Sequence, residues 1–256
     1  MDRIAETVGQ GVIRVFEVIG SVFFFIFKMI SRIPVLLKSP HLTIEHMSKI
    51  GITSLPLVAI TSVFTGAVTS WQAAYQFSDY IPISYIGVAA GKAIMINLGP
   101  VLTALVVAGR IGAAMAAELG TMKVTEQIDA MECLSLDPVQ YLVMPRFVAC
   151  VVMLPMLVIL SSFVGLMGAM FCASIFFDLD GHIFMNGVKL FFALKDVIIG
   201  LIKSVIFGAI IASMGCYYGY YTSGGAQGVG EATKKSVVAC SVWILVAGYV
   251  IDGLFL

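Results

Sequence analysis

The sequence has 256 residues, of which 60% are hydrophobic and only 12% are charged, about half the charged fraction of a soluble domain. So few charges cannot cover a water-exposed surface, so the composition excludes a soluble globular protein and indicates an integral membrane protein. The 15 basic and 15 acidic residues balance, so no overall charge attracts nucleic acid or an acidic partner.

The N-terminal region, residues 1–49, interleaves charged and apolar residues. This pattern is typical of a helix that lies in the membrane interface, here expected on the cytoplasmic side. The region has no short apolar run followed by a small-residue cleavage site, so we do not expect a removable signal peptide. A sixth span over residues 18–33 is the alternative, and Lys28 and the short uncharged run argue against it.

Five later segments are apolar and long enough to cross a bilayer core of about 30 Å as helices. They cover residues 50–77, 83–117, 147–177, 197–221 and 236–251. The expected fold class is therefore an all-α integral membrane protein, with an interfacial N-terminal helix and a five-span domain over residues 50–256. Basic residues gather at one set of span ends, which predicts a cytoplasmic N-terminus and a C-terminus on the outer side.

The second span contains small residues at four-residue spacing. Such rows let helices approach closely in a membrane, either within one chain or between subunits. The candidate helix-packing residues are Gly109, Gly112, Ala116 and Gly120.

The inner loop that follows, residues 118–138, predicts a short amphipathic helix at about 121–137. Thr125 is the expected N-cap, and Asp137-Pro138 ends the segment. Apolar residues recur on one face at positions 128, 131 and 134, and polar residues occupy the other faces. Two interpretations stay open, namely a connector at the interface and a coupling helix that fits a groove on a cytoplasmic motor subunit.

The residues typical of catalysis or metal binding do not form recognisable patterns. The three histidines and five cysteines are scattered, and we expect the cysteines to be small apolar packing residues. The glycine-rich segment 223–230 is predicted to be an inner loop and lacks the lysine of a phosphate-binding loop. We therefore expect neither an enzyme nor a metal site. Lys92, Lys203 and Asn97 are candidates for substrate contact, and the alternative for each lysine is snorkelling to the interface.

The segments Asn97–Gly120 and Thr125–Met131 resemble the MlaE/YrbE permeases of MCE-type lipid ABC transporters. The resemblance runs from about residue 50 to the C-terminus, through shorter motifs in the same order as in the family. These motifs are Leu136–Pro138, Pro145–Phe147, Ile202–Phe207 and Gly228–Thr233.

The resemblance implies a homodimeric, multi-pass permease in the cell inner membrane, with a periplasmic C-terminus. Its expected partners are cytoplasmic ATP-binding subunits, a STAS-like regulator in some systems, and a periplasmic MCE-domain protein. Such systems move phospholipids or related lipids between the inner membrane and the MCE assembly and bear on outer-membrane lipid asymmetry. No cofactor is expected in this chain, because the partner binds the ATP.

The resemblance also suggests two sets of site residues. The ATPase-coupling set is Glu118, Thr125, Glu126, Gln127, Ile128, Asp129 and Met131. The lipid-binding set is Thr69, Phe77, Tyr80, Asn97 and Lys203. The family commonly has an acidic residue where this chain has Asn97, so Lys203 is the ionisable member of the set and is expected to hold an anionic phosphate as a point charge.

Two other classes of function remain as alternatives. A channel or secondary transporter needs polar residues strung through its spans, and the third span offers only Ser161, Ser162 and small residues. A membrane anchor of a complex needs no amphipathic inner helix.

Overall fold

The computed structural model describes residues 20, 25, 40–77, 85–190 and 192–255, and all regular elements within them are helices. Within these described residues, five helical stretches are long and apolar enough to cross a membrane, which confirms the five predicted spans. They are His41–Gln76, Ile86–Val124, Val139–Phe177, Leu194–Tyr220 and Gly225–Phe255. Of the N-terminal region 1–49, the structure describes Gly20, Phe25 and residues 40–49, and the last ten residues belong to α2. The rest of the expected interfacial helix and of the alternative span over 18–33 lies outside the described residues.

The helices are longer than the apolar runs that predict them. Helix α2, Pro40–Phe77, has 38 residues, or about 57 Å at 1.5 Å per residue, so its ends project beyond the hydrocarbon core. The prediction of an inner loop at 223–230 is wrong for most of its length, because α10 begins at Gly225 and continues to Phe255. The turn before it is short because Gly224 and Gly225 adopt positive φ angles of 90° and 67°, which glycine tolerates without strain.

The second span is a continuous but irregular helix. It consists of α3 (Ile86–Ala93), η3 (Ile94–Leu98), α4 (Gly99–Val107), η4 (Ala108–Gly112) and α5 (Ala113–Val124). The η elements are π-helical turns, which widen the helix locally and are frequent at functional sites. Pro100 accounts for η3, because a proline ring clashes with the carbonyl four residues earlier.

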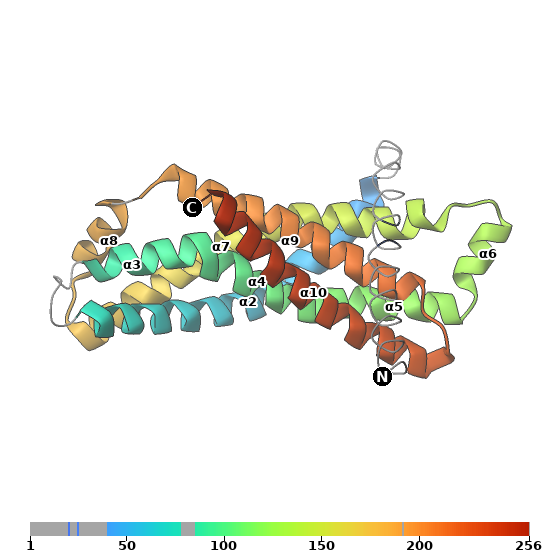
Figure 1. The fold of residues 1–256 in the computed structure, drawn as a ribbon, viewed down its shortest axis with the longest axis horizontal. Helices are drawn as coiled ribbons and strands as arrows, with labels where there is room; N and C mark the ends of the chain where they lie inside the picture. The colour runs from blue at the N-terminus through green and yellow to red at the C-terminus, as the bar shows by residue number, and fades with distance from the viewer. Residues whose placement is uncertain (1–19, 21–24, 26–39, 78–84, 191, 256) are drawn as a thin grey trace, which may run out of the picture.

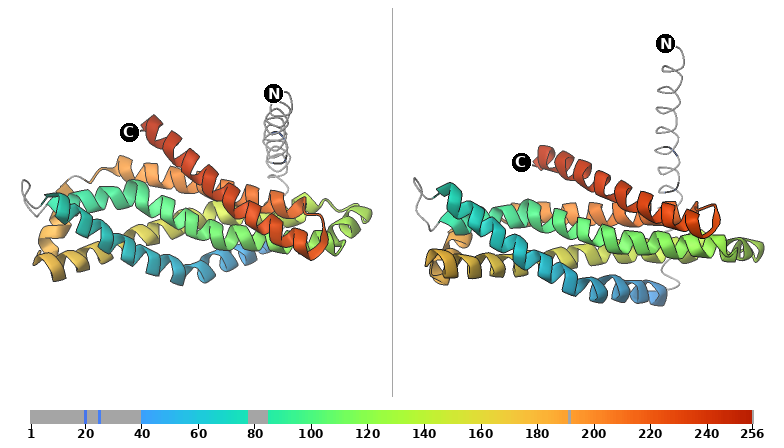
Figure 2. Two further views of the ribbon diagram at one scale, coloured as in Figure 1. Left: turned by 60° about the horizontal axis from the view of Figure 1, so that its bottom comes forward. Right: turned by 90° about the horizontal axis from the view of Figure 1, so that it is seen from below.

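The spans lie side by side and alternate in direction (Figure 1). The short helix α6 (Gln127–Cys133) joins the second and third spans at one end of the bundle, and α8 (Gly181–Leu190) joins the third and fourth at the other. We call these the α6 end and the α8 end. The third span, η5 (Val139–Val143) with α7 (Met144–Phe177), packs along α2. Helix α9, Leu194–Tyr220, contacts α5, α7 and α10, and α10 crosses the bundle obliquely (Figure 2).

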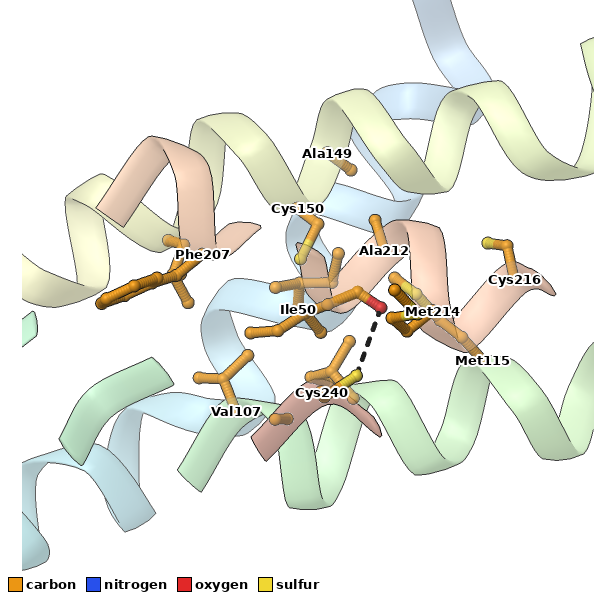
Figure 3. Close-up of a cluster of buried hydrophobic side chains, with 14 of the residues drawn as sticks. Ile50, Val107, Met115, Ala149, Cys150, Phe207, Ala212, Met214, Cys216 and Cys240 are labelled. Carbon is orange, nitrogen blue, oxygen red and sulfur yellow. Dashed lines mark hydrogen bonds between the residues drawn. The ribbon is translucent and has the colours of Figure 1, made fainter. Parts of the chain in front are cut away.

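The core lies where α5, α7, α9 and α10 meet. Side chains from several spans converge there, among them Met115, Cys150, Phe207 and Cys240 (Figure 3). Four of the five cysteines are buried, as expected of packing residues, whereas Cys133 on α6 is exposed. That exception follows from its position, because α6 lies at the end of the bundle with few neighbours to cover it.

Candidate functional site

A cluster of polar groups surrounds Lys203 inside the bundle. Lys203 on α9 is 0% exposed, and its Nζ lies 2.5 Å from Asp252 Oδ1 on α10. The same Nζ donates hydrogen bonds to the Ile96 carbonyl at 3.0 Å and to Asn97 Oδ1, both on η3. A buried ammonium is tolerated in a membrane protein only with such partners. The cluster therefore ties the second, fourth and fifth spans together.

The irregular backbone at η3 leaves a carbonyl group free to accept a hydrogen bond in this cluster. Pro100 has no N–H to donate to the carbonyl of Ile96, four residues earlier. The Lys203 ammonium donates to that carbonyl instead. The residues that shape η3 therefore also create an acceptor for the lysine.

The cluster lies in the half of the bundle nearer the α8 end. Lys203 follows Leu194, the first residue of α9, by nine residues (203 minus 194), or about 14 Å along the helix. Asp252 stands three residues before Phe255, the last residue of α10 (255 minus 252). Its side chain is 26% exposed, so Asp252 is the member of the ion pair that can be reached from outside.

The structure brings together two of the five predicted lipid-binding residues, Asn97 and Lys203. Lys203 does not snorkel to the interface, since its charge is neutralised inside the bundle. Thr69 is buried on α2 and its hydroxyl donates to the Thr65 carbonyl at 2.7 Å. Phe77 is the last residue of α2, and Tyr80 lies outside the described residues.

Sequence reasoning missed Asp252, because the predicted fifth span ends at residue 251, one residue before this carboxylate. A signal was available. A lysine in the middle of an apolar span needs a counter-charge, and Asp252 is the only acidic residue that the fifth predicted span and its tail contain.

An apolar groove lies beside the cluster, between α7, α9 and η3. It has a volume of about 220 Å³, and its lining includes Met95, Phe163, Gly200 and Leu201. Its walls are the kind of surface that takes hydrocarbon chains. Lys203 therefore lies one helical turn from a groove of this character, on the same helix as Gly200.

At the α6 end, a short helix lies between the second and third spans as predicted, but it covers only Gln127–Cys133 and not 121–137, because residues 121–124 continue α5. The predicted N-cap is wrong. Thr125 ends α5, and its hydroxyl donates to the Thr121 carbonyl at 2.9 Å. Glu126 separates the two helices with a left-handed φ of 60° and is the residue at the N-cap position. A hydroxyl already bonded one turn back is not available to cap the next helix.

Helix α6 turns part of its apolar face toward the bundle. Ile128 is 0% exposed and Met131 is half-buried, whereas Glu126, Gln127 and Leu134 are exposed. Outward-facing groups at this end are thus acidic, amide and apolar side chains.

Polar contacts fix α6 and the adjoining helix ends. Lys123 at the end of α5 pairs with Asp129 of α6 at 2.5 Å. The hydroxyl of Tyr220, the last residue of α9, donates to Glu132 Oε1 at 2.9 Å. Glu118 on α5 pairs with Arg146 on α7 at 3.0 Å, and the arginine side chain is only 4% exposed. Glu118 is therefore bound within the chain, and polar contacts hold α6 to the second and fourth spans.

The row of small residues in the second span packs mainly within the chain. Gly112 lies against Ile211 and Cys240, and its carbonyl accepts a hydrogen bond from Ser236 at 3.3 Å. Ala116 is 0% exposed, and a Cβ on Gly120 would meet the Thr222 side chain at 3.0 Å. Gly109 differs, since it is exposed and has open space around it.

Comparison with known proteins finds similar sequences over most of the chain. The family model described as "Permease MlaE" matches residues 43–254. A "Probable ABC transporter permease protein" of Rickettsia felis is 41% identical over 255 residues, covering 99% of this chain and 98% of the relative. A protein of the same description from Synechocystis sp. is 44% identical over 212 residues, or 83% of this chain and 81% of the relative. The chloroplast protein TRIGALACTOSYLDIACYLGLYCEROL 1 of Arabidopsis thaliana is 36% identical over 213 residues, or 83% of this chain and 61% of the relative.

Proposed function

The chain belongs to the MlaE family of ABC transporter permeases, and on that premise we propose that it moves phospholipids or related lipids out of or into the membrane. A permease of this kind works with an ATP-binding partner, which supplies the hydrolysis step. One relative is named after a glycolipid, trigalactosyldiacylglycerol. This name and the apolar groove beside Lys203 support a lipid as the cargo.

The observation that carries the proposal is the buried ion pair between Lys203 and Asp252. A lysine buried in a membrane protein must keep a counter-charge, because an unpaired ammonium there is costly. A lipid phosphate that displaces the Asp252 carboxylate satisfies this requirement, since one anion replaces another. Asp252 is partly exposed and is therefore the partner that a headgroup reaches first.

The remaining lipid-site residues then form the wall around the acyl chains. Asn97 holds the lysine in position through its side-chain oxygen. Thr69, Phe77 and Tyr80 belong to the first span or the segment that follows it, and we assign them to the apolar side of the cavity. That cavity forms between two copies of the chain, and the open space at Gly109 supports close approach of a second copy in the second span.

At the α6 end, α6 is proposed to dock on the ATP-binding subunit. The exposed Glu126 and Gln127 face the partner, whereas Ile128, Asp129 and Met131 anchor the helix to its own bundle. The contacts of Glu118 and Thr125 fix the end of α5 that leads into α6. In this orientation the α6 end is cytoplasmic, and the C-terminus of α10 is periplasmic.

Membership in the family supports a proposal for the wider assembly. We propose a homodimer in the inner membrane, two ATP-binding subunits, a STAS-like regulator in some complexes and a periplasmic MCE-domain protein at the α8 end. Purification of the chain with its ATP-binding subunit, followed by ATP-dependent transfer of a labelled phospholipid, tests the function. A channel, a secondary transporter or a membrane anchor would show no transfer that depends on ATP hydrolysis.

A further inference from the structure

Tyr220 lies where α9 meets α6. It ends α9, and its hydroxyl donates to Glu132 on α6 at 2.9 Å. Its ring packs against the rings of Phe25 and Tyr221, with centroids 6.0 and 5.3 Å away. The phenol is thus held by the aromatic cluster while its hydroxyl reaches the short helix.

We propose that the hydrogen bond from Tyr220 to Glu132 makes α9 follow the movements of α6, so that Tyr220 is a positioning residue for transport. This inference rests on the proposed function, in which α6 contacts the ATP-binding subunit. It adds a specific link between that contact and the helix that carries Lys203.

The backbone of α6 is suited to move as a unit. Non-glycine residues with left-handed φ angles stand on both sides of it, Glu126 at 60° and Ser135 at 58°. These sharp breaks separate α6 from the helices before and after it. Its position is then set by its side-chain contacts, which include Glu132 to α9 and Asp129 to α5.

Helix α9 can pass a displacement along its length. It is one α-helix of 27 residues, and no proline interrupts it. Tyr220 and Lys203 are 17 residues apart (220 minus 203), or about 25 Å along the axis. Gly219 packs directly on the backbone of α5 at Ala116, so this end of α9 moves with α5. A shift at Tyr220 therefore changes where Lys203 stands relative to Asp252 on α10.

Docking of a partner strengthens the link. Glu132 is exposed in the chain alone, and water competes for its carboxylate. A subunit that covers α6 removes that water, and a hydrogen bond to a charged acceptor is stronger where the local dielectric constant is lower. The bond would then be firmest in the assembled complex.

The test uses the complete complex in vesicles of phosphatidylethanolamine and phosphatidylglycerol that contain a fluorescent phospholipid. Tyr220→Phe removes the hydroxyl and keeps the ring, and Tyr221→Phe is the matched control in the same cluster. Lipid transferred per ATP hydrolysed should fall about fivefold or more in Tyr220→Phe. The amount of bound ATP-binding subunit and the basal rate of ATP hydrolysis should stay at wild-type values in Tyr220→Phe. Lipid transferred per ATP hydrolysed should stay at the wild-type value in Tyr221→Phe.

Two further variants separate a link from a packing effect. Glu132→Ala should match Tyr220→Phe, and the double variant should be no worse than either single one, because both remove the same bond. Glu132→Gln keeps an acceptor oxygen and should restore part of the transfer.

Several results would overturn the inference. These are wild-type transfer per ATP in Tyr220→Phe, an equal loss in Tyr221→Phe, additive losses in the double variant, or release of the ATP-binding subunit by Tyr220→Phe. If the wild-type complex itself transfers no lipid with ATP, the proposed function fails instead, which is a distinct outcome.

Discussion

Lys203 on α9 and Asp252 on α10 form an ion pair with 2.5 Å between Nζ and Oδ1, and the lysine has no exposed surface. The pair joins the fourth and fifth spans in the half of the bundle nearer the α8 end. Asn97 and the carbonyl of Ile96 complete the surroundings of the ammonium from the second span. One buried charge thus connects three spans at the proposed lipid site.

The first prediction concerns the stability of this pair. Asp252→Ala leaves the buried ammonium without its counter-charge and should lower the free energy of unfolding by about 3 kcal/mol. Lys203→Met combined with Asp252→Leu replaces both charges by apolar groups and should recover most of that loss. Unfolding in detergent micelles, followed by tryptophan fluorescence, measures both effects.

The control for the pair is Glu231→Ala, which removes the acid from an exposed pair with Lys235 on α10. It should change the free energy of unfolding by no more than about 1 kcal/mol. An Asp252→Ala variant as stable as the wild type would show that the ion pair does not hold the two spans together.

The second prediction places the lipid. Photocrosslinking amino acids at positions 77 and 80 should capture phospholipid, and capture should fall when Lys203→Glu replaces the cation that attracts the phosphate. A crosslinker at Phe171, which is exposed on the third span and lies outside the groove lining, is the comparison. Capture at Phe171 with none at positions 77 and 80 would place the lipid path on the outside of the third span.

The third prediction concerns the docking of α6. Reversal of charge in Glu126→Lys should weaken assembly with the ATP-binding subunit or lipid transfer, while the protein still inserts in the membrane and Lys123 stays paired with Asp129. Glu231→Lys serves as control, since Glu231 is exposed at the α6 end of α10 but not on α6. An unchanged complex with unchanged transfer in Glu126→Lys would remove α6 from the mechanism.

The fourth prediction is the orientation of the chain. A periplasmic reporter fused after Leu256 should be active, and a cytoplasmic reporter at the same place should be silent, because five spans place the two ends on opposite sides. Activity of the cytoplasmic reporter would mean that an additional segment crosses the membrane.

The sequence predicts the features that depend only on residues within one segment of the chain. An apolar run must form a helix in lipid because its backbone groups have no other partners, so all five spans could be predicted. Their ends could not, because a polar residue outside the bilayer continues a helix as readily as it ends one. Gly225–Gly230 shows this, since the segment expected as a loop is the first turn and a half of α10.

The site was less predictable because it depends on how helices rotate against one another. Asn97 and Lys203 were singled out as polar groups in apolar runs, and they are in contact. Their third partner, Asp252, stands on another helix, and no local pattern gives the rotation of α10 about α9. Thr125 failed as an N-cap for a related reason, since its hydroxyl serves the helix before it.

Reconstitution tests the central claim most directly. The chain and its ATP-binding subunit are placed in vesicles with a fluorescent phospholipid, and lipid transfer to an acceptor is followed with ATP or with a non-hydrolysable analogue. We expect transfer that requires ATP hydrolysis and that falls at least tenfold in Lys203→Glu, equivalent to about 1.4 kcal/mol of lost interaction. Transfer at equal rates with ATP and with the analogue, or with and without this chain, would contradict the assignment as a lipid permease.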